Sequence, residues 1–263
     1  MKIAFHRLLL VLLLLLATVP VYALQGDLDL GFSSDGKLDA VVGNGNEYGR
    51  KVGIQSLAGV DYLIIAGHAY NDTLKNHDMI VRRYLPNGSL DTLFGTAGVQ
   101  TIDFGNGDDY LTDLYIYPDG RLLLAGYTNS TGGGDFAVAL LTPSGLLSTS
   151  FGLMGKKTID ISGLDDKAYA VNVMTTAGSD KILVAGSAMI DHGTVQVPDL
   201  DLDFAVVRLN LDGNLDSTFN STGIATKDIT TAGETAYGVG VQSSGKIIVA
   251  GVDSTFPSEI RLI

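Results

Sequence analysis

The chain contains no cysteine and no tryptophan, and only 17% of its 263 residues are charged. Without cysteine neither a disulfide nor a cysteine-linked lipid anchor can form, so the fold must be held by its own core. An apolar content of 46% excludes a disordered chain. The 33 glycines suit an all-β protein with many turns.

Basic residues are scarce relative to acidic ones. There are 17 Lys and Arg against 29 Asp and Glu, which gives a net charge of −12. A surface of this sign repels phosphate backbones and anionic membranes, so nucleic-acid binding is excluded. Such a surface favours cations, basic partners or neutral ligands.

Catalytic signatures are missing as well. The sequence has no G-x-S-x-G, no H-E-x-x-H and no phosphate-binding glycine loop, and cysteine nucleophiles are absent. We therefore expect no catalytic residue and no bound organic cofactor. A carboxylate pair for glycoside hydrolysis remains open, because acids are plentiful.

The one long apolar run lies at the start of the chain. Leu8–Ala17 follows Lys2 and Arg7 and precedes Val21-Tyr22-Ala23, which has small residues at the cleavage positions. Ten apolar residues are too few to span a bilayer. The pattern predicts a signal peptide over residues 1–23 and export after cleavage near Ala23, with an uncleaved anchor as the alternative. No later segment reaches transmembrane length.

The remaining residues, 24–263, repeat four times. An apolar segment that ends in Ala-Gly recurs about every sixty residues, with its glycine at Gly67, Gly126, Gly186 and Gly251. A fixed period of this length is typical of repeat architectures. We take residues 24–263 as one domain of four repeats.

The residue pattern of each repeat predicts four antiparallel strands. In the fourth repeat Tyr237, Val239 and Val241 alternate with small residues, and an apolar run follows at Lys246–Ala250. The preceding repeat supplies the other two strands at Phe204–Leu209 and Ile224–Ile229, joined through an Asp-Gly turn. Helical periodicity is absent, so the fold class is an all-β propeller of about four blades.

The two ends of the chain predict a shared blade. Gly26–Phe32 matches the turn that elsewhere follows a third strand, and Glu259–Ile263 resembles the third strand itself. Pairing Lys37–Val42 with Glu259–Ile263 removes an open edge and closes a ring. An open array, or a ring completed by a second copy, remains the alternative, so a monomer and a homodimer are both open.

Three motifs recur in the same order. They are a G-x-L-D-x-x-F turn, an apolar strand ending in Ala-Gly, and a D-F-A-V-x-R-L strand. Their combination at sixty-residue spacing resembles the delta-60 repeat, a bacterial β-propeller repeat of exported and surface proteins and a domain of unknown function. Ser148 departs from the turn aspartate, and Asn220 from the glycine after the phenylalanine. The resemblance implies a propeller fold and an extracytoplasmic location. It does not imply any particular activity.

One acid occupies the same position in every repeat. Seven residues before the equivalent strand positions stand Glu47, Asp109, Asp166 and Glu234. Carboxylates that converge around a channel mouth repel, and a hard cation such as Ca²⁺ relieves the repulsion. The alternative is a turn in which each acid accepts backbone N–H groups.

Further acids and histidines lie in the loops between second and third strands. The first such loop holds His68, Asp72, His77 and Asp78, and the longest, about Ser187–Leu202, leads to Asp203 and holds Asp191, His192, Asp199 and Asp201. Neither has an established metal spacing, so solvated loop charges are the simpler interpretation. Asp203 is matched by Asp78 and Asp135, which marks it as a repeat feature.

These observations predict an exported, non-catalytic scaffold that binds a protein, polysaccharide or cation through its acidic loop face. The alternative is a hydrolase or lyase that acts on a sugar or ester with loop carboxylates. A deep central pocket with converging carboxylates of raised pKa would favour the enzyme, and a shallow face would favour the binding module.

Overall fold

The structure, a computed structural model, describes residues 27–38, 46–105, 107–129, 133–175, 179–194, 197–230, 232–254 and 260–262. Within these ranges the chain forms strands and turns and no helix. No helix that could cross a membrane is found among them. The predicted signal peptide, residues 1–23, lies outside the described residues.

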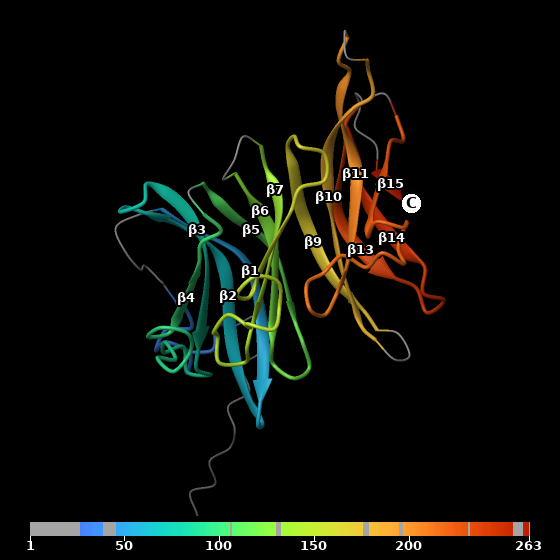
Figure 1. Ribbon diagram of the computed structural model, residues 1–263. Helices are drawn as coiled ribbons and strands as arrows, with labels where there is room; N and C mark the ends of the chain where they lie inside the picture. Colours follow the sequence, from blue (N-terminus) through green and yellow to red (C-terminus); the bar gives the residue numbers. More distant parts are fainter. Residues whose placement is uncertain are drawn as a thin grey trace, which may run out of the picture.

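The strands form four consecutive antiparallel sheets that stand side by side in a row (Figure 1). The first sheet comprises β1 (Glu47–Leu57), β2 (Val60–Asn71), β3 (Asn76–Tyr84) and β4 (Val99–Ile102). The second comprises β5 (Asp109–Ile116), β6 (Leu122–Thr128), β7 (Asp135–Leu141) and β8 (Lys156–Ile159). The third comprises β9 (Asp166–Met174), β10 (Lys181–Asp191), β11 (Leu200–Asn210) and β12 (Ile224–Lys227). The fourth comprises β13 (Glu234–Val241), β14 (Ile247–Asp253) and β15 (Ile260–Leu262).

In each sheet the strands pair in sequence order, as in a propeller blade. The predicted all-β propeller of four-stranded blades is therefore confirmed. The strands β1, β5, β9 and β13 are the inner strands of the four blades, because each inner strand packs on the inner strand of the next blade.

A β-bulge explains why the second strand of each blade has glycine at the end of its apolar run. In each inner strand the register shifts opposite the Ala-Gly pair, as between Gly49 and Lys51. The bulge brings a backbone carbonyl so close that a Cβ on Gly67 would lie 1.8 Å from the Tyr48 oxygen. The corresponding distances at Gly126, Gly186 and Gly251 are 1.9 to 2.0 Å. Only glycine fits there, so the Ala-Gly motif marks the position of the bulge in each blade.

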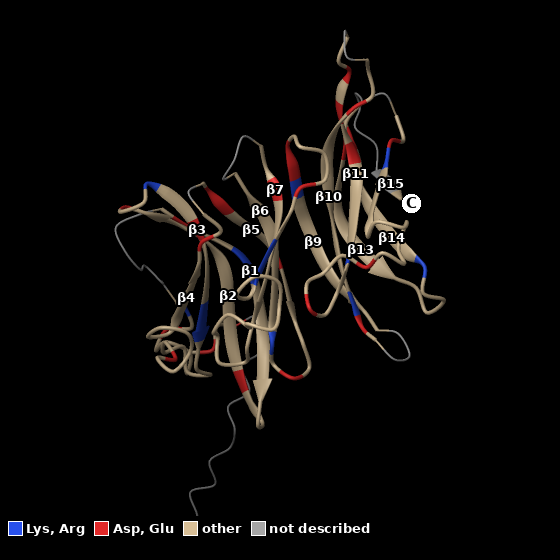
Figure 2. Ribbon diagram, viewed as in Figure 1, with Lys and Arg blue, Asp and Glu red and all other residues tan. Residues whose placement is uncertain are grey.

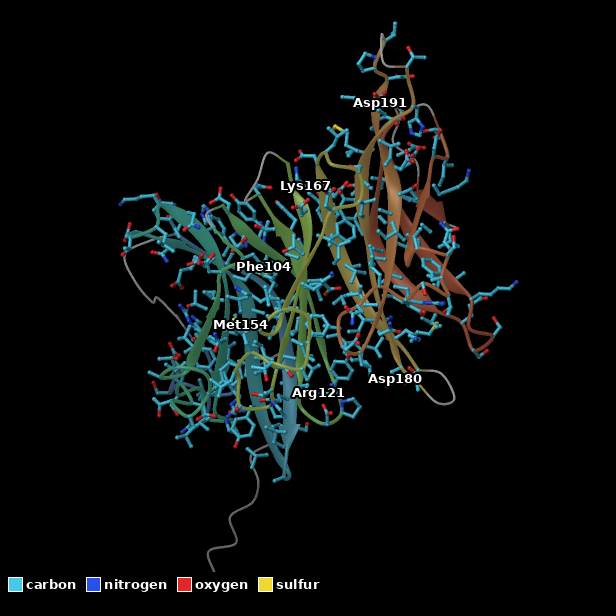
Figure 3. All side chains as sticks on the ribbon, viewed as in Figure 1. Phe104, Arg121, Met154, Lys167, Asp180 and Asp191 are labelled. Atoms are coloured by element: carbon cyan, nitrogen blue, oxygen red, sulfur yellow. The ribbon has the colours of Figure 1, made fainter. Side chains whose placement is uncertain are left out.

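The hydrophobic core lies between neighbouring blades (Figure 3). Between the second and third sheets, fully buried side chains include Leu123, Val138 and Phe151. Between the first and second sheets they include Ile64, Met79 and Phe94. Alternating apolar positions thus cover both faces of a central blade, and burying each such side chain contributes about 1.5–3 kcal/mol.

The turn after each third strand connects one blade to the next. The Gly95 N–H donates to the Ser144 carbonyl at 2.8 Å, and the Gly152 N–H donates to the Asp212 carbonyl at 2.7 Å. The opening turn behaves in the same way, because the Ser33 N–H donates to the Asn87 carbonyl at 2.9 Å. The interpretation of Gly26–Phe32 as such a turn is thus supported over its described part.

Most of the closing pair predicted for the ring lies outside the described residues, because these do not include 39–45, 255–259 and 263. The described N-terminal turn packs on the first sheet, while β15 ends the fourth sheet at the opposite end of the row (Figure 1). The comparison of the C-terminus with Val207–Leu209 is offset by three residues. Gly251 pairs with Arg261, whereas its counterpart Gly186 pairs with Ala205.

Candidate functional site

The four acids predicted from the repeat lie at the same place, the first residue of β1, β5, β9 and β13. Asp109, Asp166 and Glu234 are fully buried. Each accepts hydrogen bonds from its own preceding loop: Asp109 from the Phe104 N–H at 2.6 Å, and Glu234 from the Thr230 N–H at 2.9 Å. The turn role that the sequence offered as an alternative is therefore present in these three blades.

Glu47 differs from the other three. Its carboxylate makes a bidentate pair with the Arg82 guanidinium, at 2.7 and 3.0 Å. A paired arrangement of this kind neutralises the carboxylate within its own blade.

The structure does not gather Glu47, Asp109, Asp166 and Glu234 into one group. Where three ligand atoms among the described residues lie within 4.8 Å of one another, each group contains at most one of the four. Its partners are an acid of the preceding third strand and an acid of the loop between blades. These junction clusters are Asp78–Asp103–Asp109, Asp135–Asp160–Asp166 and Asp203–Asp228–Glu234. Figure 2 shows acidic residues at the same end of β5 and β9.

The junction cluster between the first two blades combines burial with like charge. Asp78 is 3% exposed. Burial raises the pKa of Asp78, and the nearby Asp103 carboxylate raises it further. Burial raises the pKa of Asp109 to about 6, with the Phe104 N–H acting in the opposite sense and with Asp103 and Asp78 adding to the increase.

The cluster between the second and third blades is better supplied with donors. Asp166 accepts the Ile161 N–H at 2.7 Å, the Ser162 N–H at 3.2 Å and the Ser162 hydroxyl at 2.9 Å. Burial still raises the pKa of Asp166 against these hydrogen bonds. Both carboxylate oxygens of this residue therefore have partners.

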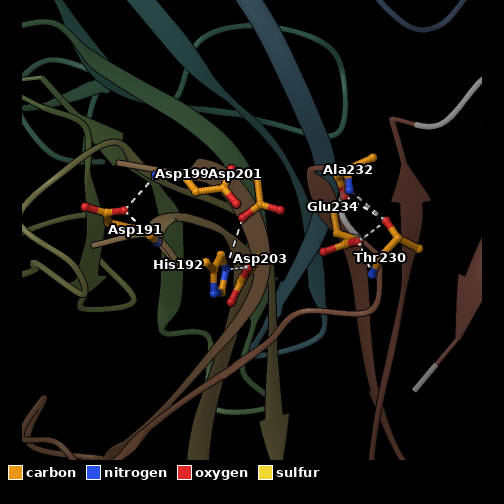
Figure 4. Close-up of polar contacts among 9 residues, drawn as sticks. Asp191, His192, Asp199, Asp201, Asp203, Thr230, Ala232 and Glu234 are labelled. Carbon is orange, nitrogen blue, oxygen red and sulfur yellow. Dashed lines mark hydrogen bonds and ion pairs between the residues drawn. The ribbon is translucent and has the colours of Figure 1, made fainter. Parts of the chain in front are cut away.

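A histidine lies beside the cluster between the third and fourth blades and contacts its Asp203 (Figure 4). His192 Nε2 lies 2.9 Å from Asp203 Oδ1 and 3.0 Å from Asp201 Oδ1. The hydrogen bond with Asp203 raises the pKa of His192, so a cation already lies beside these acids when the ring is protonated. The prediction that Asp203, Asp78 and Asp135 occupy one repeat position is confirmed by their pairing with Ala188, Ala69 and Thr128.

The second-to-third-strand connections are shorter than predicted. The Ser187–Leu202 segment is largely strand, because β10 continues to Asp191 and β11 begins at Leu200. Asp199 is not part of the histidine group; its N–H donates to Asp191 Oδ1 at 2.9 Å. In the first blade His68 lies buried in β2, and His77 contacts Asp108 at 3.0 Å.

An aromatic row crosses all four blades, and sequence reasoning missed it. Successive ring centroids lie 4.9 to 6.4 Å apart, within the range of aromatic contact. The row consists of Tyr48, His68, Tyr110, Tyr127, Tyr169 and Tyr237. These residues come from three different positions of the repeat, so no single aligned column reveals them. Aligning on the bulge shows that Tyr169 and Tyr237 are equivalent.

Three rings of the row, Tyr110, Tyr169 and His68, are neutral at physiological pH. Burial raises the pKa of Tyr110 and of Tyr169 to about 12. Burial lowers the pKa of His68 to about 4, and the charges of Arg50 and His77 act in the same direction. Tyr48 and Tyr237, the two ends, are 45% and 58% exposed. The row is therefore buried in part and exposed at its two ends.

A cavity of about 390 Å³ follows part of this row. Its lining comes from the inner parts of all four blades and contains no acidic residue: Arg50, Lys51, Tyr110, Leu111, Thr112, Tyr127, Tyr169 and Tyr237. The Lys51 ammonium is held by Asp113 at 3.0 Å, whereas Arg50 is exposed. The lining thus combines aromatic faces with the exposed guanidinium of Arg50, for which no ion pair is found among the described residues.

Among the comparisons with known proteins, the family match agrees with the fold. A family model described as a domain of unknown function (DUF5122) beta-propeller matches residues 63–94, 118–151 and 201–219. No curated protein matches the chain. Among solved structures, the Bombyx mori GH32 beta-fructofuranosidase BmSUC1 is similar with a TM-score of 0.35 and 11% identity, over 79% of this chain and 43% of that chain. The family match supports a β-propeller of unknown function.

Proposed function

We propose that this protein is an exported, non-catalytic β-propeller scaffold that binds a polysaccharide along the aromatic row. The observation that carries the proposal is the row itself, which continues from Tyr48 to Tyr237 across four blades. Partly exposed tyrosines offer large flat faces and hydroxyl tips, which suit the C–H faces and hydroxyls of sugars.

The length of the row supports a polymer as the ligand. A single small molecule needs one enclosed pocket, whereas these rings follow one another over consecutive blades. The exposed Arg50 at the edge of the cavity can donate to a sugar hydroxyl or carboxylate. Specificity between neutral and acidic polysaccharides therefore depends on Arg50 in this proposal.

Glycoside hydrolysis fits the geometry less well. It needs two carboxylates that reach the substrate, yet the cavity lining contains none. The carboxylate with the most strongly raised pKa, Asp109, is fully buried in a blade junction. These observations favour binding over catalysis.

Export and the repeat family belong to the proposal as well. We retain the signal peptide over residues 1–23 and the assignment of the repeats to the delta-60 repeat. Expressed with its leader in a bacterial host, the protein should be recovered outside the cytoplasm with Leu24 as its first residue. Recovery only inside the cell with Met1 retained would contradict export.

Binding of soluble glucans, mannans and uronic-acid polymers to the purified protein, measured by affinity electrophoresis, tests the proposed ligand class. Tyr237→Ala should weaken retention of the bound polysaccharide by about tenfold, because it removes the contact with one aromatic face, which is worth on the order of 1 kcal/mol. Tyr237→Phe keeps the ring and should bind nearly as the wild type. Tyr237 is 58% exposed, so neither change disturbs the core.

A variant away from the row provides the matched control. Leu153 is 78% exposed and lies on a different surface, so Leu153→Ala should leave binding unchanged. Equal retention of wild type and Tyr237→Ala on every polymer, or release of reducing ends from any of them, would refute the proposed function.

A further inference from the structure

The three junction clusters share one arrangement but differ in what neutralises their acids. In each, one carboxylate oxygen from each of three acids lies within 4.8 Å of the others. Asp166 has hydrogen-bond donors on both oxygens, and Asp203 has the His192 ring. The first cluster, Asp78–Asp103–Asp109, has neither device.

The first cluster contains an unsatisfied buried oxygen. Asp78 is 3% exposed, and its Oδ2 accepts the Asn71 amide at 2.8 Å. Its Oδ1 has no hydrogen-bond donor among the described residues. A buried carboxylate oxygen without a partner costs the full desolvation of that atom, about 1–3 kcal/mol or more. Such an atom in a cluster of acids points to a bound cation.

The basic groups near this cluster do not compensate it. Among the described residues no Lys or Arg forms an ion pair with Asp78, Asp103 or Asp109. Lys156 is the nearest candidate, but its Nζ donates to the backbone carbonyl of Asp103. His77 is engaged with Asp108.

We propose that Asp78, Asp103 and Asp109 together bind one Ca²⁺ ion, which joins the first blade to the second. Three carboxylates are hard oxygen ligands of the kind that Ca²⁺ prefers, and Ca²⁺ tolerates irregular geometry with added water or carbonyl ligands. Mg²⁺ demands near-ideal octahedral geometry and dehydrates reluctantly, so it fits a largely buried cluster less well. The proposal is independent of polysaccharide binding.

The site differs from the cation site that the sequence suggested. Only Asp109 is common to both, because its partners come from β3 and from the loop after β4. Glu47 is paired with Arg82, and Asp166 is fully hydrogen bonded. Glu234 also keeps one oxygen, Oε2, without a hydrogen-bond partner among the described residues, but its cluster contains Asp203, which contacts the His192 ring.

Isothermal titration of the EDTA-treated, dialysed protein with CaCl₂, and separately with MgCl₂, tests the proposal. The wild type should bind one Ca²⁺ per chain. Asp78→Asn and Asp109→Asn should each weaken Ca²⁺ binding by about tenfold or more, because each removes an anionic ligand. Two matched controls, Glu47→Gln and Asp166→Asn, should bind Ca²⁺ within about twofold of the wild type.

Thermal unfolding keeps the test valid if a variant folds poorly. In EDTA, Asp109→Asn should melt at or above the temperature of the wild type, because it relieves repulsion in the cluster. In CaCl₂ the order should reverse, because only the wild type gains from the ion. A purely structural role of Asp109 predicts a lower melting temperature in both solutions.

Three results would overturn the proposal. They are the absence of both heat and a melting shift with CaCl₂, unchanged Ca²⁺ affinity in Asp78→Asn and Asp109→Asn, and an equal loss of affinity in Asp166→Asn.

Discussion

Two equivalent positions in the first and third blades show how strongly the neighbouring blade decides whether a side chain is buried. Val52 in β1 and Val171 in β9 follow the bulge by the same two residues. Val171 is 7% exposed, because the second blade covers it, whereas Val52 is 70% exposed. Ile54, two residues after Val52, is 56% exposed in the same way.

The difference shows that a blade supplies two apolar faces and needs two neighbours. The second and third blades have a neighbour on each side, and their facing side chains form the largest core. The first blade has one neighbour within the described residues. Its outer face is an exposed apolar surface of the kind that a closing blade or a second copy covers.

The largest expected effect on stability comes from placing a charge at each of the two valines. Val171→Asp places an unpaired charge in the core and should cost about 3–5 kcal/mol of the free energy of unfolding. Val52→Asp should change it by less than about 0.5 kcal/mol if the outer face of the first blade is free in solution. Urea unfolding followed by circular dichroism measures both.

The same pair distinguishes an open row from a closed assembly. A cost above about 2 kcal/mol for Val52→Asp would mean that this face is covered in solution. Light scattering then separates a monomer that closes on itself from a homodimer. In both the closed monomer and the homodimer, Val52 would be buried in solution, and its contrast with Val171 would not hold.

A smaller effect separates the third blade from the second at low pH. The Asp216 side chain accepts the Thr218 hydroxyl, which lowers its pKa to about 2, with Lys181 and Arg208 contributing. The folded pKa is below the ordinary value near 3.8, so the carboxylate stabilises the fold above about pH 4 and this contribution is lost as pH falls toward 2.

The second blade has Ser148 opposite Leu140 at this turn, where the third has Asp216 opposite Arg208. The stability difference between wild type and Asp216→Asn should therefore shrink between pH 5 and pH 2, and Ser148→Ala should show no such trend. Urea unfolding at each pH provides the values. A constant difference for Asp216→Asn would disprove the proposed role of its charge.

The smallest effect concerns the residue after the turn phenylalanine. Asn220 has a φ of 46°, close to the 55° of Gly95 and 51° of Gly152. Asparagine tolerates this region, which explains its presence where the repeat otherwise has glycine. Asn220→Gly should alter the free energy of unfolding by no more than about 0.5 kcal/mol, and Asn220→Val should cost about 1–2 kcal/mol. Thermal melts compare the two, and an equal cost would be contrary to this account.

Much of the fold could be predicted from the sequence because its signals are local. The Ala-Gly motif recurs since a bulged carbonyl leaves no room for a Cβ at Gly67 and its equivalents. Alternating side chains such as Tyr237, Val239 and Val241 predicted a strand, which β13 confirms. The strand boundaries were less accurate, because β10 and β11 extend into the segment expected as a loop.

The candidate site was predictable only in part. Aligning repeats located Glu47, Asp109, Asp166 and Glu234, but not their partners, since Asp78 and Asp109 belong to different blades. The aromatic row was missed because its rings come from unrelated repeat positions, such as Tyr127 in β6 and Tyr169 in β9. The acid clusters and the aromatic row both depend on the distance between side chains of neighbouring blades.

The sequence by itself determined the sixty-residue period, the strand order and the glycine at each bulge, because these follow from alternation and steric contact within a few residues. Only the tertiary structure decided that Val52 is exposed while Val171 is buried, and that Asp78 and Asp109 share a cluster. Burial and charge repulsion depend on distances between residues of different blades, and no pattern within one repeat encodes those distances.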